Sequence, residues 1–212
     1  MPHATKPSKT SDILRVILAR CEGEGSISIG EFLNLLGDRA FCLAILVFAL
    51  PNSLPIPGIP GFSTITGLPI VFIAAQMMLG RDVIWLPKRV AARSFSKSTL
   101  AKILTKSIPF IEKLEKFLKP RWTWLTEGFG ERVVGLMLVV LALILSLPIP
   151  GGNFLPGISI TLLSLCLLEK DGKLLLAAIF VSLTSFYVML KVVIEVFSWL
   201  FGVIAGWWNM LF

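Results

Sequence analysis

Ser53-Leu54-Pro55-Ile56-Pro57-Gly58 is a six-residue string that the chain repeats without change as Ser146-Leu147-Pro148-Ile149-Pro150-Gly151. The match continues upstream without a gap, and residues 37–58 aligned with residues 130–151 give twelve identities in twenty-two positions. Shared apolar composition does not produce such a run of proline, glycine and arginine, so we infer an internal duplication. Each copy has a charged start, an uncharged apolar helix, a proline-glycine break and a second apolar helix.

Long stretches of the chain carry no charged side chain, namely residues 40–79, 133–168 and 174–190. Uncharged apolar runs of this length are typical of helices in lipid. The sequence therefore predicts an all-α integral membrane protein, with residues 1–212 as a single membrane domain. The alternative, a soluble all-α protein, would have to bury all three runs in a chain of 212 residues.

Few residues suit catalysis or metal binding. The one histidine, His3, lies in a polar tail, and Cys21, Cys42 and Cys166 have no paired spacing. We expect no metal, no cofactor and no histidine-based catalytic site, so an enzyme is the weakest functional hypothesis. The first twelve residues are polar and contain no apolar signal region, so the N-terminus is expected to stay in the cytoplasm.

The N-terminal region, residues 11–36, is expected to be amphipathic. Ser11 or Asp12 can cap a first helix, and the glycine-rich residues 21–30 indicate a turn before a second helix that begins near Gly30. The apolar residues of the first helix recur at helical spacing as Ile13, Leu14, Ile17 and Leu18. Such a helix suits either the membrane surface or packing on the rest of the protein.

The first repeat, residues 37–80, predicts a helical hairpin broken by proline. Its first arm, Ala40 to about Asn52, rises only ~20 Å, whereas the hydrocarbon core of a bilayer is ~30 Å thick. Four prolines and two glycines in residues 51–61 break the helix. A second arm is expected from about Phe62 to Leu79.

The second repeat, residues 130–172, predicts the same geometry. Its first arm, Val133–Leu147, rises ~22 Å, and a short second arm is expected from about Ile158 to Leu168. Because the arms are short, we interpret both copies as re-entrant hairpins whose tips lie at membrane depth. The alternative is a pair of ordinary spanning hairpins with the proline loops at the far surface. A homodimer would help to shield the re-entrant tips.

The segment between the repeats, residues 81–129, is strongly basic. It carries eleven Lys or Arg against four Asp or Glu, a surplus equal to the net charge of the chain, +7. Pro87, Pro109 and Pro120 are expected to divide it into amphipathic helical pieces. The positive-inside rule places it in the cytoplasm, on anionic membrane lipids, and nucleic acid is not expected as a partner. Both hairpins would then enter from the cytoplasm in parallel; an inverted arrangement is the alternative.

The C-terminal region, residues 173–212, holds the best candidate for a full membrane span. Lys173–Leu190 is an apolar run that is ~27 Å long as a helix. The tail that follows, Phe197–Phe212, is aromatic. It is expected either to lie on the far interface or to return as a second span.

Several motifs, taken together, resemble those of a known family. They are the charged Gly-[Asp/Glu]-Arg starts at Gly37 and Gly130, the Pro-x-Pro-Gly break in both halves, Gln76 near Gly80-Arg81-Asp82, Trp85-Leu86-Pro87, and Lys170-Asp171-Gly172. Over roughly residues 11–195 the chain is similar to the bacterial exopolysaccharide synthesis protein ExoD family. The resemblance implies a multi-pass bacterial inner-membrane protein linked to exopolysaccharide production and to tolerance of alkaline conditions. It implies no reaction and no catalytic residues.

The two proline-glycine loops are the predicted site of a small transporter or a protein that handles a lipid carrier. The second arms are expected to begin at Gly61 and Gly157, where free N–H groups attract anions such as the phosphate of a lipid-linked sugar. The alternative is a non-catalytic membrane scaffold for polysaccharide-assembly proteins. The candidate substrate-binding residues are Asn52, Pro55, Pro57, Gly58, Gly61, Ser63, Gln76, Pro148, Pro150, Gly151, Asn153, Gly157 and Ser159. The charged starts, expected to form ion pairs across the repeats or with neighbouring acids, are Asp38, Arg39, Glu131 and Arg132.

Overall fold

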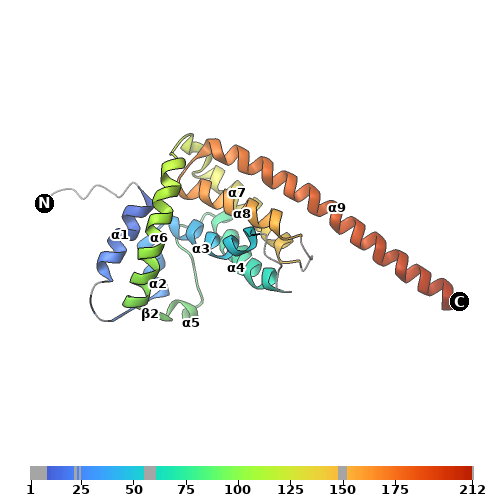
Figure 1. Ribbon diagram of the computed structural model, residues 1–212, viewed down its shortest axis with the longest axis horizontal. Helices are drawn as coiled ribbons and strands as arrows, with labels where there is room; N and C mark the ends of the chain where they lie inside the picture. The colour runs from blue at the N-terminus through green and yellow to red at the C-terminus, as the bar shows by residue number, and fades with distance from the viewer. Residues whose placement is uncertain (1–8, 22, 24, 55–60, 148–151, 212) are drawn as a thin grey trace.

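The computed structural model describes residues 9–21, 23, 25–54, 61–147 and 152–211. Most of these residues are helical, in agreement with the predicted all-α class (Figure 1). The elements in chain order are α1 (Thr10–Arg20), β1 (Ser26–Ser28), α2 (Ile29–Leu36), α3 (Arg39–Ala49), η1 (Leu50–Ser53), α4 (Phe62–Met78), α5 (Lys88–Ala91), β2 (Ser94–Ser96), α6 (Lys97–Phe117), η2 (Thr123–Leu125), α7 (Phe129–Leu145), α8 (Phe154–Leu168) and α9 (Gly172–Leu211).

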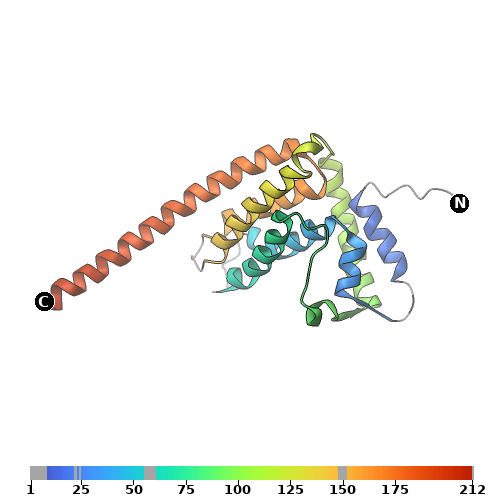
Figure 2. The ribbon, with the colours of Figure 1, turned by 180° about the vertical axis from the view of Figure 1, so that it is seen from behind.

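Four apolar helices, α3, α4, α7 and α8, form the body of the molecule (Figures 1 and 2). Helices α3 and α7 are the first arms of the two hairpins, and each packs against both second arms, α4 and α8. The helices share one hydrophobic core, whose fully buried side chains include Phe41, Ile45, Ile70, Leu138 and Leu163.

Glycines let helices α4 and α7 approach each other closely. A Cβ atom at Gly67 would lie 3.1 Å from the carbonyl oxygen of Ala142, and a Cβ atom at Gly135 would lie 2.8 Å from the backbone nitrogen of Met78. Small residues at helix contacts are typical of helices that associate in lipid, because close backbone approach there replaces the hydrophobic driving force.

Both hairpins point the same way within the body. The starts of α3 and α7 and the ends of α4 and α8 line one cavity, at what we call the charged end. At the opposite end, which we call the proline end, Ser53 bonds to Thr161 and Asn153 bonds to Ser63 across the repeats. This relative direction is the one that a parallel arrangement of the hairpins requires.

The second arm of the second repeat begins earlier than expected. Helix α8 starts at Phe154 rather than near Ile158, so Pro156 and Gly157 lie inside its first turn. Proline is tolerated there because the first N–H groups of a helix have no intrahelical acceptor to lose. Gly157 therefore does not begin the helix, whereas Gly61 does stand immediately before α4, with a φ of +82°.

The basic segment is folded against the N-terminal region. Strands β1 and β2, which were not expected, pair in antiparallel register with Ile27 opposite Phe95. The expected division of α6 at Pro109 is wrong, because the helix runs through this residue from Lys97 to Phe117. Its apolar stripe is buried on both sides of the proline, and this packing compensates for one lost backbone hydrogen bond.

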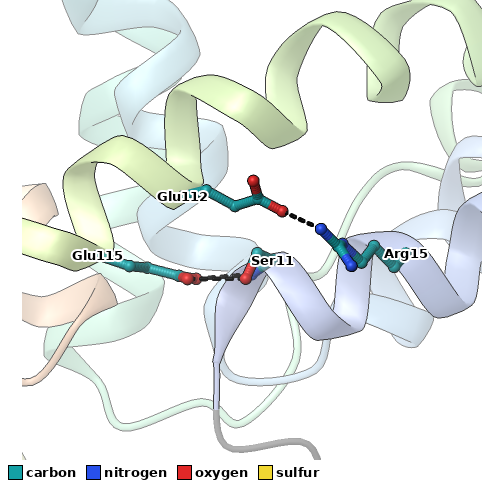
Figure 3. A network of polar contacts seen from close by, with 4 residues as sticks. All are labelled: Ser11, Arg15, Glu112 and Glu115. Atoms are coloured by element: carbon teal, nitrogen blue, oxygen red, sulfur yellow. Dashed lines mark hydrogen bonds and ion pairs between the residues drawn. The ribbon is translucent and has the colours of Figure 1, made fainter.

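Helix α1 packs on the protein through its buried Leu14 and Ile17. Packing on the protein was one of the two expected positions, and the membrane surface was the other. The expected capping by its own Ser11 or Asp12 is not observed. Instead, the backbone N–H and the hydroxyl of Ser11 both donate to the Glu115 carboxylate of α6, each at 2.7 Å (Figure 3). A carboxylate at this position complements the positive N-terminal end of the helix.

Helix α9 is a single helix of 40 residues, so the aromatic tail continues this helix and does not return as a second span. The position of the tail at the far membrane interface stays a prediction. Its first part lies along α8, and the rest extends away from the body to the C-terminus (Figures 1 and 2). Gly202 and Gly206 do not end it, since a helix-interior glycine costs only ~1 kcal/mol.

One described helix is by itself long and apolar enough to cross a membrane, and that is α9. The qualifying part, Gly172–Gly206, has a mean hydropathy of 2.1. Helix α2 and the segment Arg39–Ser53 pass the same test only if the pair, which bends by 117°, is counted as one span. The second arms α4 and α8 are apolar but shorter.

Candidate functional site

A cavity of about 480 Å³ lies at the charged end of the body. It receives residues from the starts of both first arms and from the segments that follow both second arms. Its charged lining comprises four carboxylates and four cations: Asp38, Asp82, Glu127 and Glu131, with Arg39, Arg81, Arg132 and Lys170. The formal charges therefore balance, whereas a site for a simple anion or cation would carry an excess of the opposite charge.

The ends of the two second arms are built alike and direct charged residues into the cavity. Two residues after the end of α4, Gly80 has a φ of +72°, and the N–H of Arg81 donates to the Gln76 carbonyl at 3.1 Å. Two residues after the end of α8, Lys170 has a φ of +53°, and the N–H of Asp171 donates to the Cys166 carbonyl at 2.9 Å. These left-handed caps satisfy carbonyls that the helix leaves open.

Arg132 lies against the backbone of Gly80. A Cβ atom at Gly80 would stand 2.6 Å from a terminal nitrogen of the guanidinium, so the missing side chain leaves room for it. Arg132 is exposed, and no hydrogen bond or ion pair is recorded for its side chain among the described residues. Its five N–H donors are therefore available to a ligand in the cavity.

Gln76 fixes the loop that follows α4. Its side-chain oxygen accepts from the N–H of Trp85 at 2.7 Å, and its side-chain nitrogen donates to the carbonyl of Trp85 at 3.2 Å. The amide is buried and occupied by backbone groups. Gln76 was predicted as a substrate-binding residue together with the proline loops, but it lies near the charged end, and its side chain holds the backbone of Trp85.

Burial and neighbouring acids shape the electrostatics of the cavity. Burial, and next the Asp38 carboxylate, raise the pKa of Glu131, which lies outside the apolar run, above its ordinary value of 4.5. Lys170 donates to Glu127 at 2.6 Å, but both side chains are about half exposed, so the pair is worth at most ~1 kcal/mol. The ion pairs expected for the charged starts of the two repeats stay a prediction.

The proline end is held together by hydrogen bonds between helices. The side-chain amide of Asn52 donates to Thr66 at 2.9 Å, that of Asn153 donates to Ser63 at 2.7 Å, and the hydroxyl of Ser159 bonds to its own helix. The side-chain oxygen of Asn153 is buried, and no partner is recorded for it in the described part of the chain.

Two glycines of the proline end differ in their surroundings. A Cβ atom at Gly157 would lie 2.6 Å from the carbonyl oxygen of Asn52, so α8 and η1 touch there through their backbones. Gly61 has no atom within 4 Å of the same position. The remaining loop candidates lie outside the described residues: Pro55, Pro57, Gly58, Pro148, Pro150 and Gly151.

Part of the charged cavity was not predicted from the sequence. The charged starts were singled out, but Arg81, Asp82 and Lys170 entered only through the motifs that resemble the family, and Glu127 only as part of the basic segment. The available signal was that the charged boundaries of two parallel hairpins must meet at the same end.

The chain is an all-α protein with one helix long enough to span a membrane. Its apolar body carries a charged cavity at one end. Within this class, the chain belongs to the ExoD family: the sequence model described as "Exopolysaccharide synthesis, ExoD" matches residues 10–191. The predicted family is thereby confirmed.

Two curated relatives are similar to the chain over most of its length. Protein ExoD of Rhizobium meliloti (strain 1021) is 34% identical over 186 residues, which cover 85% of this chain and 76% of the relative. An uncharacterized protein of Synechocystis sp. is 29% identical over 174 residues, covering 82% of each chain. No solved structure matches the chain.

Proposed function

We propose that this chain is a membrane component of exopolysaccharide synthesis that binds the phosphate of a lipid-linked sugar in the charged cavity. The observation that carries the proposal is the convergence of charged residues from both repeats on one cavity of about 480 Å³, at the end of an otherwise apolar body. Family membership supplies the link to exopolysaccharide synthesis.

The balanced lining suits a sugar phosphate better than a bare anion. The guanidinium groups of Arg81 and Arg132 can hold phosphate oxygens through paired N–H donors. Carboxylates such as Asp38 and Glu131 accept hydrogen bonds, which sugar hydroxyls can donate. A cavity that served inorganic phosphate alone would gain nothing from four carboxylates, because they repel it.

Apolar surface next to the cavity supports a lipid-linked substrate. Leu79 precedes Gly80 and is 68% exposed, and Leu136, one helical turn beyond Arg132, is 51% exposed. Leu79 directly follows α4, and Leu136 lies in α7. These two helices pack together along the body. A lipid tail on this surface would leave its phosphate at the arginines.

The membrane arrangement is part of the proposal. The basic segment 81–129 and the N-terminus face the cytoplasm, and the two hairpins enter the inner membrane from that side as re-entrant elements. The cavity then opens to the cytoplasm, and the residues of the proline end seal the hairpin tips within the bilayer. A homodimer that shields these tips stays a prediction.

A scaffold is the second candidate function. The observation in its favour is that α9 extends from the body with large apolar side chains exposed, among them Phe197 and Trp199. Such a helix could bind another membrane protein of polysaccharide assembly.

Exopolysaccharide yield of cells that carry single variants tests the proposal. Arg132→Ala should reduce the yield strongly and Arg132→Lys should restore it partly, because lysine keeps the charge but loses the paired donors. Arg93→Ala, an exposed arginine outside the cavity, is the matched control and should have no effect. A normal yield from Arg132→Ala protein present at wild-type level in the membrane would reject the cavity as the functional site.

A further inference from the structure

A second cavity, of about 640 Å³, lies between α2, α3 and α6. Helices α2 and α3 meet at a bend of 117°, and α6 and Phe95 of β2 complete the walls. We call this cavity the apolar groove. Its volume falls within the ~300–1,000 Å³ that is usual for small-molecule sites.

The lining of the groove is almost wholly apolar and partly open. Val47 of α3 is 66% exposed, and Ile103 and Phe110 of α6 are 53% and 50% exposed. Apolar walls with a few polar groups are the usual lining of a small-molecule site. The shape and lining suit one flexible hydrocarbon chain.

The polar groups of the groove are confined to α6, where Lys106 and Ser107 belong to the lining. Lys102 and Lys113 are exposed one and two helical turns away from Lys106. The helix therefore presents positive charge beside the apolar walls.

The acidic residues of α6 do not neutralise this charge. Glu112 forms an ion pair with Arg15, and Glu115 accepts both bonds from Ser11, so both carboxylates face α1 (Figure 3). No ion pair is recorded for Lys106 in the described part of the chain. An anionic head group at Lys106 would complement the unbalanced charge.

We propose that the apolar groove binds an acyl chain of an anionic phospholipid, with the lipid phosphate at Lys106. The occupant is a diacyl lipid rather than a partner helix, because the groove combines one cationic edge with apolar walls. This matches a molecule with a single polar end. The site shares no residue with the charged cavity and does not depend on it.

Native mass spectrometry of the full-length protein, released from detergent with defined lipids, tests the assignment. Dioleoyl phosphatidylglycerol should be retained at least ~10-fold better than dioleoyl phosphatidylcholine, which corresponds to ~1.4 kcal/mol. Lys106→Glu should abolish this preference. Lys116→Glu, the same charge change at an exposed lysine of α6 outside the groove, should leave it intact.

Ile103→Trp fills the groove at a half-exposed position and should lose both lipids while the circular dichroism spectrum stays helical. Equal retention of the two lipids by the wild type, or full retention by Ile103→Trp, would overturn the proposal. The proposal would also be overturned if the wild type were a dimer and Ile103→Trp made it monomeric without changing the bound lipid. The occupant of the groove would then be a second chain. Binding of a lipid-linked sugar should be unchanged in Lys106→Glu and in Ile103→Trp, and this result would separate the apolar groove from the charged cavity.

Discussion

Replacing Gly157 by alanine should loosen the contact between the repeats at the proline end. The new Cβ atom would lie 2.6 Å from the carbonyl oxygen and 2.7 Å from the carbonyl carbon of Asn52. Ordinary contacts begin near 3.4 Å, so the backbones of α8 and η1 must separate by several tenths of an ångström or more. Neither atom belongs to a flexible side chain, so no rotamer change can relieve the clash.

The expected cost follows from two opposing effects. Overpacking of a tight contact costs ~1–3 kcal/mol. Alanine regains ~0.5–1 kcal/mol of helix propensity relative to glycine. The two ranges leave a net loss of ~0–2.5 kcal/mol, so we expect Gly157→Ala to lower the free energy of unfolding by about 1 kcal/mol.

Denaturation of the purified protein in detergent, followed by circular dichroism, measures the change. Gly202→Ala is the matched control, because Gly202 is also helical but has no atom within 4 Å of its Cβ position. The control should be neutral or stabilised by up to ~1 kcal/mol. If Gly157→Ala is as stable as Gly202→Ala, the backbone contact between the repeats is not tight and this reasoning fails.

Three other predictions concern the charged end and the topology. Gln76→Leu should destabilise the protein by ~1–3 kcal/mol, because it leaves the backbone groups of Trp85 without their partners, and thermal unfolding against Gln76→Asn as a shorter amide would measure this. Burial raises the pKa of Glu131, so stability should fall as pH rises from 4.5 through the raised pKa; Glu131→Gln should flatten this dependence in melts across that range, and an unchanged profile would contradict it. A single cysteine at Ser98, with the native cysteines replaced, should resist an impermeant thiol reagent in intact cells, and ready labelling would reverse the proposed orientation.

The sequence was sufficient to predict the helical arms, since uncharged apolar runs and proline breaks are local signals. It placed the first arms and α4 nearly where the structure has them. It failed where tertiary packing overrides a local signal. Pro109 lies inside α6 because the apolar stripe is buried on both sides of it, and Pro156 lies in the first turn of α8, where proline is tolerated.

The candidate site was predictable only in part. Arg39 and Arg132 stand out because the duplication repeats them, and both line the charged cavity. Lys170 and Arg81 join them only through the left-handed caps at the ends of α8 and α4, which no local pattern marks as functional. Three-residue strands such as β1 have too few residues to show an alternating pattern, so the β1–β2 pair could not be predicted.

Direct binding of a polyprenyl-phosphate-linked sugar to the purified protein tests the central proposal. In detergent, the wild type and Arg93→Ala should bind it alike, whereas Arg132→Ala should weaken binding ~10- to 100-fold, since a hydrogen bond to a charged group contributes ~1.5–3 kcal/mol. The neutral polyprenol, which lacks the phosphate, should bind the wild type no more tightly than it binds Arg132→Ala. Equal affinity of the wild type for the polyprenol and the phosphate-linked sugar, or undiminished binding by Arg132→Ala, would contradict a phosphate site in the charged cavity.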